Sequence, residues 1–288
     1  MFMMEVDRKV FYPPAAFLLI LTCIGFYGNT SIVWATIKFK ELRYPCGILI
    51  AILALGDIGH QLAHIPYAFL VFSGVMTISQ RSCFWIQLIP AVSMQHAIVT
   101  IASLGVDRFI CVTRPILYRS IGLSSRMKVV YLVAVNILPV LYSVSLAVYA
   151  YIETEKHPHR QTMCLISAFF TGNSTNVWAM STAAVTIFSV FVYVVIWIVL
   201  RKKTHVSHCV RNTFKPLSIV LSLTFCGWLV GMAVVSYFES RIDLSRNTRI
   251  GLISYAGLSI NASIAANYFV YRRSMTDYKM AFKDLWRA

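Results

Sequence analysis

One face of an apolar segment carries three side chains that could do chemistry. Asp57, His60 and His64 stand at positions i, i+3 and i+7, so a helix through this segment places them on the same side. Carboxylate and imidazole groups at this spacing can bind a divalent metal ion, or they can line a polar pocket that senses cations. They can also hydrogen-bond inside a helical bundle, which is the plainer interpretation of the two histidines.

A metal-handling membrane protein would need more ligands than these three. Four of the other histidines fall in expected loops: His157, His159, His205 and His208. No CxxC pair suggests zinc. We therefore expect no bound metal, and we keep the metal-handling protein built on Asp57, His60 and His64 as an alternative.

A second chemical group, Asp107 followed directly by Arg108, ends a long apolar segment. In isolation, an adjacent acid and base predict a salt bridge at the edge of an apolar layer. Pro115 and Tyr118 follow at a spacing that is hard to ascribe to chance. There is no paired nucleophile and base, phosphate-binding loop or cofactor fingerprint, so the sequence predicts neither an enzyme nor a cofactor.

The elements that must position these groups are long and apolar. The 288 residues are 58% hydrophobic and 13% charged, whereas an ordinary soluble domain has about 25% charged residues. A helix needs about 20 mostly apolar residues to cross a bilayer. Seven blocks reach this length, and they are continuously apolar rather than alternating, which favours helices over a barrel. By residue number the blocks run about 15–37, 46–73, 82–106, 127–151, 177–200, 216–238 and 249–271.

The fold class predicted from these blocks is all-α, a seven-transmembrane helix bundle that forms a single domain over residues 1–288. A further segment, about 273–286, repeats large apolar residues on one helical face among lysines and arginines. These residues are Met275, Tyr278, Phe282 and Trp286. The pattern predicts a short amphipathic helix on the inner leaflet of the lipid bilayer.

Lysine and arginine are divided unequally between alternate loops, which sets the orientation in the membrane. One side holds 18 of the 26 basic residues, including those of the C-terminal tail. We therefore expect a multi-pass plasma-membrane protein with its N-terminus outside and its C-terminus in the cytoplasm. Nucleic-acid binding, the other interpretation of a net charge of +15, is not expected, because the charge is separated by membrane side.

Two features agree with this orientation. Asn173 begins an Asn-Ser-Thr triplet in a loop assigned to the outside, where it could be glycosylated. Cys83 and Cys164 also fall on the outer side, in an oxidising compartment, and we predict that they form a disulfide. The remaining cysteines lie in helices or on the cytoplasmic side, where reduced thiols are the rule.

The inner end of the third block resembles that of the rhodopsin-like G-protein-coupled receptors. Asp107, Arg108 and Phe109 stand where this family has Asp-Arg-Tyr, and Cys83 precedes Asp107 by the family's 24 residues. The resemblance extends along the chain, through Gly28-Asn29, the Leu-Ala-Leu-Gly run that ends at Asp57, and the segment from Asn267 to Tyr271.

The chain also departs from the family pattern. Phe109 replaces tyrosine, Tyr268 replaces proline, no proline follows Trp228, and the fifth block lacks its usual proline. These changes put the bends of the last three helices in question, because proline is the commonest cause of sharp kinks. Together with the short loops, these changes make the sequence resemble the nematode serpentine chemoreceptors of the Srsx group. The same changes also leave open an alternative, a membrane protein that has the shape of a receptor but does not couple to a G protein.

The resemblance implies how such a receptor would signal. Asp107 would hold Arg108 until an extracellular ligand opens a cytoplasmic cleft for a heterotrimeric G protein. Pro115 and Ile116 would contact the G protein, whose inserted helix would bind Arg108. An interior polar network would relay the change, and its expected members are Asn29, Asp57, Asn267 and Tyr271.

The ligand pocket is expected to open outward among the third, fifth, sixth and seventh helices. Its candidate residues are Gln87, Met94, Gln95, Trp178, Ser181, Trp228, Met232 and Tyr255. For each methionine and aromatic residue, ordinary bundle packing is the alternative. Pro90 stands where amine receptors of the family carry aspartate, so the resemblance implies a neutral small molecule or a peptide as ligand.

Overall fold

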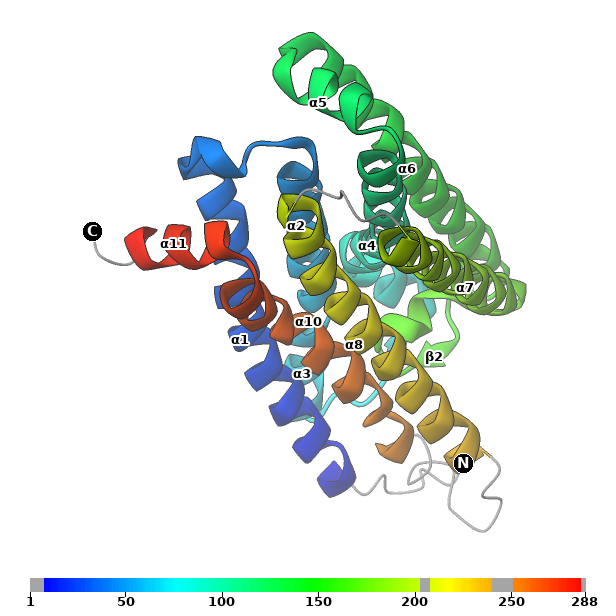
Figure 1. The fold of residues 1–288 in the computed structure, drawn as a ribbon. Coiled ribbons are helices and arrows are strands. Elements are labelled where there is room, and N and C mark those ends of the chain that lie inside the picture. The colour runs from blue at the N-terminus through cyan, green and yellow to red at the C-terminus, as the bar shows by residue number, and fades with distance from the viewer. Residues whose placement is uncertain (1–7, 203–207, 240–250, 286–288) are drawn as a thin grey trace, which may run out of the picture.

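The computed structural model describes residues 8–202, 208–239 and 251–285, and nearly all of this part of the chain is helical (Figure 1). The α-helices are α1 (Tyr12–Lys38), α2 (Pro45–Gln61), α3 (His64–Phe72), α4 (Gln80–Thr113), α5 (Pro115–Leu123), α6 (Ser125–Lys156), α7 (Asn173–Lys202), α8 (His208–Glu239), α10 (Ala256–Ser274) and α11 (Thr276–Leu285). Short 3₁₀ helices are η1 (Arg8–Val10), η2 (Lys40–Leu42) and η3 (Ile166–Phe169). Two short strands, β1 (Ile78–Ser79) and β2 (Gln161–Thr162), pair antiparallel. The predicted all-α class is confirmed.

Six helical segments in the described part of the chain are long and apolar enough to cross a membrane. They are α1, α2 with α3, α4, α6, α7 and the stretch Phe214–Val235 of α8. The predicted seventh span corresponds to α10, which is more polar because it carries Asn261, Asn267 and several serines. This helix packs between α1 and α8, so its polar side chains are covered by neighbouring helices. The expected start of that span, Arg249, lies outside the described residues.

The second span is not the single helix expected over 46–73. It is divided into α2 and α3, with Leu62 and Ala63 between them. Pro66 explains the position of the break, because it has no N–H to donate to the carbonyl four residues earlier, at Leu62. That carbonyl accepts instead from the N–H of Ile65 at 3.3 Å. The break turns the Ala63 carbonyl toward α4, where the Gln87 side chain donates to it at 3.3 Å.

A second proline creates a link between helices. Pro139 lies inside α6 and leaves the carbonyl of Val135 without its usual helical donor. Ser103 of α4 supplies one, since its hydroxyl donates to the Val135 carbonyl at 3.2 Å. In an apolar surrounding a backbone group must be satisfied within the protein, so this bond holds α4 and α6 in register.

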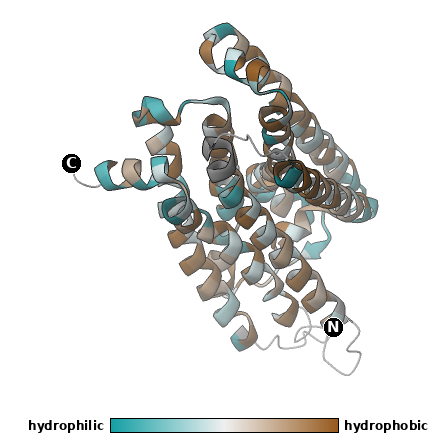
Figure 2. Ribbon diagram, in the orientation of Figure 1, coloured by the Kyte–Doolittle hydropathy of each residue, from teal (hydrophilic) through white to brown (hydrophobic). Residues whose placement is uncertain are grey.

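The bundle is centred on α4, which packs against α2, α6 and α7. Large apolar side chains of α6 and α7 remain exposed along their outer faces, which suits helices that face lipid rather than water. Figure 2 shows hydrophobic residues along the lengths of the helices and hydrophilic residues gathered toward their ends. The buried positions therefore serve helix packing, and the exposed apolar ones form the membrane-facing surface.

The amphipathic C-terminal helix, expected at about 273–286, is α11, which turns away from the end of α10 (Figure 1). It begins at Thr276 because α10 continues to Ser274. Tyr278 and Phe282 are buried, and the Tyr278 hydroxyl lies 3.2 Å from that of Thr36 in α1. Trp286, the last residue of the expected apolar face, lies outside the described residues.

Candidate functional site

At the end of α4, four side chains form a compact group that we call the inner cluster: Asp107, Arg108, Tyr118 and Tyr131. The guanidinium of Arg108 donates to one carboxylate oxygen of Asp107 through Nε at 2.8 Å and Nη2 at 2.5 Å. The Tyr131 hydroxyl donates to the other oxygen at 2.8 Å. Tyr118 donates to the carboxylate at 3.0 Å and accepts a bond from Arg108.

Burial makes these contacts strong. The side chains of Asp107 and Arg108 are 0% and 4% exposed, so the pair is shielded from solvent. Arg108 also lies over the ring of Tyr118, with its guanidinium carbon 5.2 Å from the ring centroid. Burial raises the pKa of the Tyr118 phenol, although the nearby Arg108 charge opposes this. Tyr118 therefore stays neutral and able to donate at physiological pH.

Three elements supply the inner cluster. Asp107 and Arg108 come from the last turns of α4, Tyr118 from α5 and Tyr131 from α6. Sequence reasoning singled out Asp107, Arg108 and the spacing to Tyr118, but it missed Tyr131. No local pattern marks Tyr131, because its role depends on how α6 packs beside α4.

The other residues expected at this end lie on the surface. Pro115 and Ile116 begin α5 and are exposed, with 87% of Ile116 accessible. Phe109 is 37% exposed on the flank of α4. An exposed aliphatic side chain at the start of the helix that supplies Tyr118 is suited to contact a partner.

The interior polar group comprises Asp57, Asn267, Asn29 and Tyr271, and the structure joins only two of them directly. Asn267 of α10 donates to the carboxylate of Asp57 in α2 at 2.8 Å. Among the described residues, both amide atoms of Asn29 and the hydroxyl of Tyr271 have no hydrogen-bond partner. A cavity of about 20 Å³ touches Asp57, Asn267 and Trp228, which is room for about one water molecule.

The two histidines near Asp57 are buried but do not form a metal centre with it. His64 Nε2 lies 2.9 Å from the Asn261 side-chain oxygen, and the rings of His60 and His64 are 5.9 Å apart. His60 borders the small cavity. The described part of the chain contains no group of three potential metal ligands. The arrangement favours interior hydrogen bonding over metal binding.

At the opposite end of the bundle, a disulfide joins Cys83 of α4 to Cys164 in the loop before α7. Two further contacts hold the same loop. They are the β1–β2 pair and a hydrogen bond from the side-chain amide of Gln80 to the Ala168 carbonyl at 2.7 Å. Beyond Cys164 the loop enters the bundle, where Phe169 and Phe170 are 1% and 4% exposed.

The residues expected to line a ligand pocket divide into two sets. Gln87, Met94 and Gln95 are buried on α4, and Trp178 and Trp228 approach to 6.2 Å between ring centroids. The remaining candidates lie elsewhere: Ser181 meets the Tyr142 hydroxyl of α6 at 2.9 Å, Met232 is 57% exposed, and Tyr255 is half-buried just before α10. Of the first set, Met94, Trp178 and Trp228 pack in one hydrophobic cluster with Phe169 and Phe170.

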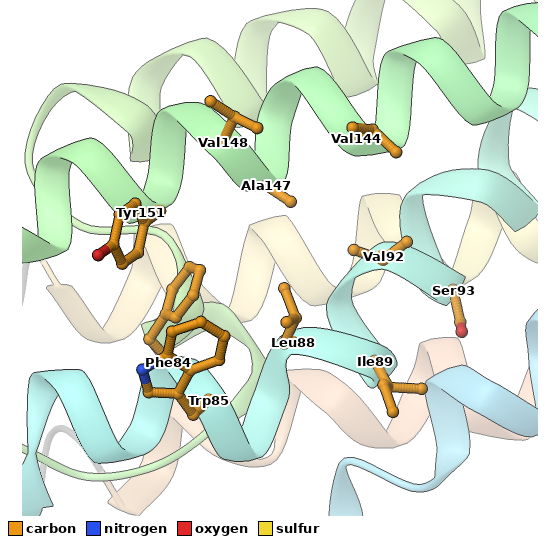
Figure 3. A pocket seen from close by; sticks show the side chains of 10 residues that line it. All are labelled: Phe84, Trp85, Leu88, Ile89, Val92, Ser93, Val144, Ala147, Val148 and Tyr151. Atoms are coloured by element: carbon orange, nitrogen blue, oxygen red, sulfur yellow. The ribbon is translucent and has the colours of Figure 1, made fainter.

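An apolar groove of about 480 Å³ lies between α4 and α6 on the outer surface (Figure 3). Figure 3 shows Trp85 and Ile89 of α4 across from Val148 and Tyr151 of α6. Among the described residues that line the groove, only Ser93 and Tyr151 carry a hydroxyl group. In a bilayer, this surface faces lipid chains.

Comparison with known proteins gives a consistent result. Residues 22–286 match the model of a family described as serpentine type 7TM GPCR chemoreceptor Srsx. The chain is 24% identical to endothelin receptor type B of Rattus norvegicus over 97% of the chain and 69% of that receptor. It is 23% identical to leukotriene B4 receptor 1 of Mus musculus, over 38% of the chain and 31% of that receptor. It is 24% identical to adenosine receptor A2b of Gallus gallus, over 38% of the chain and 32% of that receptor. The stretches matched in the last two thus span about a third of each receptor.

Proposed function

The chain belongs to the Srsx group of serpentine seven-transmembrane chemoreceptors, which are G-protein-coupled receptors, and we propose that the inner cluster is its signalling switch. This membership identifies a receptor rather than an enzyme. The observation that carries the proposal is the buried Asp107–Arg108 pair, enclosed by Tyr118 and Tyr131 from two further elements.

In the closed state, Arg108 is held in place by Asp107 and Tyr118, and it is hidden from the cytoplasm. Removing one partner from a buried ion pair costs about 3–5 kcal/mol, so the pair opens only when another interaction replaces it. The inserted helix of a G-protein α subunit offers such an interaction through its free C-terminal carbonyls. Pro115 and Ile116 add an apolar contact at the edge of the opened cleft.

A route for the signal runs through α8 and α10. Trp228 of α8 borders the small cavity together with Asp57 and Asn267. At the residue directly before Trp228, the Ser259 hydroxyl of α10 donates to the Gly227 carbonyl of α8 at 2.8 Å. The helices pack closely there, since a Cβ on Gly227 would lie 2.9 Å from the Ser259 carbonyl oxygen. A shift of Trp228 would therefore move α10 and the Asp57–Asn267 bond.

We assign the N-terminus to the outside of the plasma membrane and the C-terminus to the cytoplasm. The disulfide, which requires an oxidising compartment, and the exposed Asn173 lie at one end of the bundle. The basic residues in the last turn of α10 and on α11 belong to the other end, which suits anionic lipid. Glycosylation of Asn173 would follow from this orientation.

The extracellular ligand is proposed to be a neutral small molecule or a peptide. Pro90 occupies the α4 position at which amine receptors of the wider family carry an aspartate, and it is buried. Without that carboxylate, a charged amine has no counter-ion at this position. The buried residues nearby are amide and aromatic side chains, which suit an uncharged ligand.

The test is the substitution Arg108→Ala, assayed with a ligand found by screening small molecules and peptides against cells that express the receptor. We expect nucleotide exchange per receptor at the cell surface to be lost, because the contact between Arg108 and the G protein forms only in the open state. Arg114→Ala is the matched control, since Arg114 is exposed just beyond the same helix. Normal exchange by the Arg108 variant would refute the proposed switch.

A further inference from the structure

The second outer loop places two adjacent phenylalanines inside the bundle, and we call Phe169 and Phe170 the aromatic plug. The ring of Phe169 stacks on Phe84 of α4 at a centroid distance of 4.7 Å. The ring of Phe170 stacks on Trp178 of α7 at 4.8 Å, with only 5° between the ring planes. Both rings are nearly inaccessible, so the loop fills the outer part of the bundle rather than covering it.

The plug is in line with the proposed signal route. Trp178 meets Trp228 edge-on at 6.2 Å, and Trp228 borders the cavity beside Asp57. A change in the position of Phe170 would thus alter the position of Trp178 first and that of Trp228 next. The contacts form one continuous aromatic column from the loop to α8.

Three buried polar groups on α4 and α7, the helices that the plug contacts, have no hydrogen-bond partner in the described part of the chain. They are the Gln95 amide nitrogen, the Trp178 indole nitrogen and the Gln87 side-chain oxygen. Gln95 is 1% exposed, and its oxygen accepts a bond from Thr182, one helical turn beyond Trp178. A buried donor without a partner is costly, so the two donors, Gln95 on α4 and Trp178 on α7, point to an acceptor that binds between these helices.

We propose that Phe170 occupies the place of a ligand's aromatic ring, and that the natural ligand is a small molecule with one aromatic ring and an adjacent hydrogen-bond acceptor. This inference rests on the proposed receptor function and names its ligand class. The ligand ring displaces Phe170 from Trp178, and its acceptor receives bonds from Gln95 and the Trp178 indole. The acceptor is uncharged, because no cationic side chain among the described residues contacts Gln95 or the Trp178 indole.

The geometry allows the plug to leave without unfolding the receptor. The disulfide at Cys164 keeps the start of the segment on α4, while Gly172 ends it with a backbone φ of +55°. A left-handed φ of this kind is readily adopted by glycine, so the chain can turn there before α7. Displacement of Phe170 therefore requires movement between residues 165 and 172, with loss of the bond from the Thr175 hydroxyl to the Phe170 carbonyl at 3.0 Å.

The experiment measures thermal unfolding of the purified receptor in detergent against increasing acetophenone, which has an aromatic ring and a carbonyl acceptor. Stabilisation at each concentration gives the affinity. We expect Phe170→Ala to bind acetophenone at least about tenfold more tightly than the wild type, because the probe no longer competes with the Phe170 ring. Phe11→Ala is the matched control, since Phe11 is equally buried in a different part of the bundle.

Isopropylbenzene, which has the same heavy-atom connectivity as acetophenone and a similar size but no acceptor, tests the polar half of the inference. In the Phe170→Ala receptor we expect acetophenone to bind at least about fivefold more tightly than isopropylbenzene. That preference should shrink when Gln95→Leu is added. If Phe170→Ala is poorly produced, Phe170→Leu removes the flat ring with less loss of volume and takes its place.

Equal acetophenone affinity in Phe170→Ala and the wild type would overturn the inference. So would an equal gain in Phe11→Ala, which would show binding to any cavity. No preference for acetophenone over isopropylbenzene would overturn the acceptor. None of these measurements involves a G protein, so their failure is distinct from a failure of the Arg108 test.

Discussion

At the inner end of α4, the Asp107 carboxylate receives hydrogen bonds from three side chains, whereas the described residues supply one donor to Asp57, namely Asn267. The polar atoms of the inner cluster satisfy one another. In the interior polar group, Asn29 and the Tyr271 hydroxyl have no such partner. The first arrangement resists change because every bond must be replaced. The second can rearrange at little cost, which suits a relay.

The largest effect that tests this comparison is expected for Asp107→Ala. It leaves Arg108 buried without its counter-ion, and we expect the free energy of unfolding to fall by about 3–5 kcal/mol. Thermal unfolding of the purified receptor measures the change. Asp277→Ala is the control, because Asp277 is exposed on α11. A loss no greater than that of the control would mean that the ion pair contributes little to the closed state.

Tyr131→Phe should have an intermediate effect. The substitution removes one bond to a buried carboxylate and keeps the ring, so the closed state loses about 1.5–3 kcal/mol. Ligand-free nucleotide exchange should rise severalfold, because a weaker hold on Asp107 favours the open state. Tyr142→Phe breaks a neutral hydroxyl pair on the outer part of the same helix and should leave exchange unchanged. Equal basal exchange in the two variants would exclude Tyr131 from the switch.

The smallest effect is expected for Tyr271→Phe. Its hydroxyl is buried without a partner among the described residues, so the free energy of unfolding should change by no more than about 0.5 kcal/mol. Tyr278→Phe provides the contrast, because that hydroxyl pairs with Thr36 and its loss should cost about 1 kcal/mol. A larger loss in Tyr271→Phe than in Tyr278→Phe would show that the Tyr271 hydroxyl is hydrogen-bonded and that the interior group is not free to rearrange at little cost.

Sequence reasoning identified the residues whose burial is energetically costly and can be recognised from the neighbouring sequence alone. An aspartate within an apolar block needs a partner wherever the helix packs, which singled out Asp57. The adjacent Asp107 and Arg108 could be read from their order alone. The break between α2 and α3 was not predicted, although Pro66 is a local signal for it, since proline removes one helical hydrogen bond.

Other features could not be read from the sequence. Tyr131 meets Asp107 from 24 residues away because α6 packs beside α4. Phe169 and Phe170 sit in a loop, and nothing local indicates that their rings enter the bundle. Met232 was a candidate for the ligand pocket, yet it is 57% exposed, because small differences in helix rotation decide which face of α8 turns inward.

The sequence by itself determined the membrane setting, the helical class and the chemical types at both ends of α4. These follow from hydropathy, periodicity and charge, which act within one segment or between a segment and its solvent. Only the tertiary structure decided that Asn267 bonds to Asp57, that two tyrosines enclose the ion pair and that Phe170 stacks on Trp178. Each of these contacts joins segments far apart in the chain, and their meeting depends on how whole helices pack.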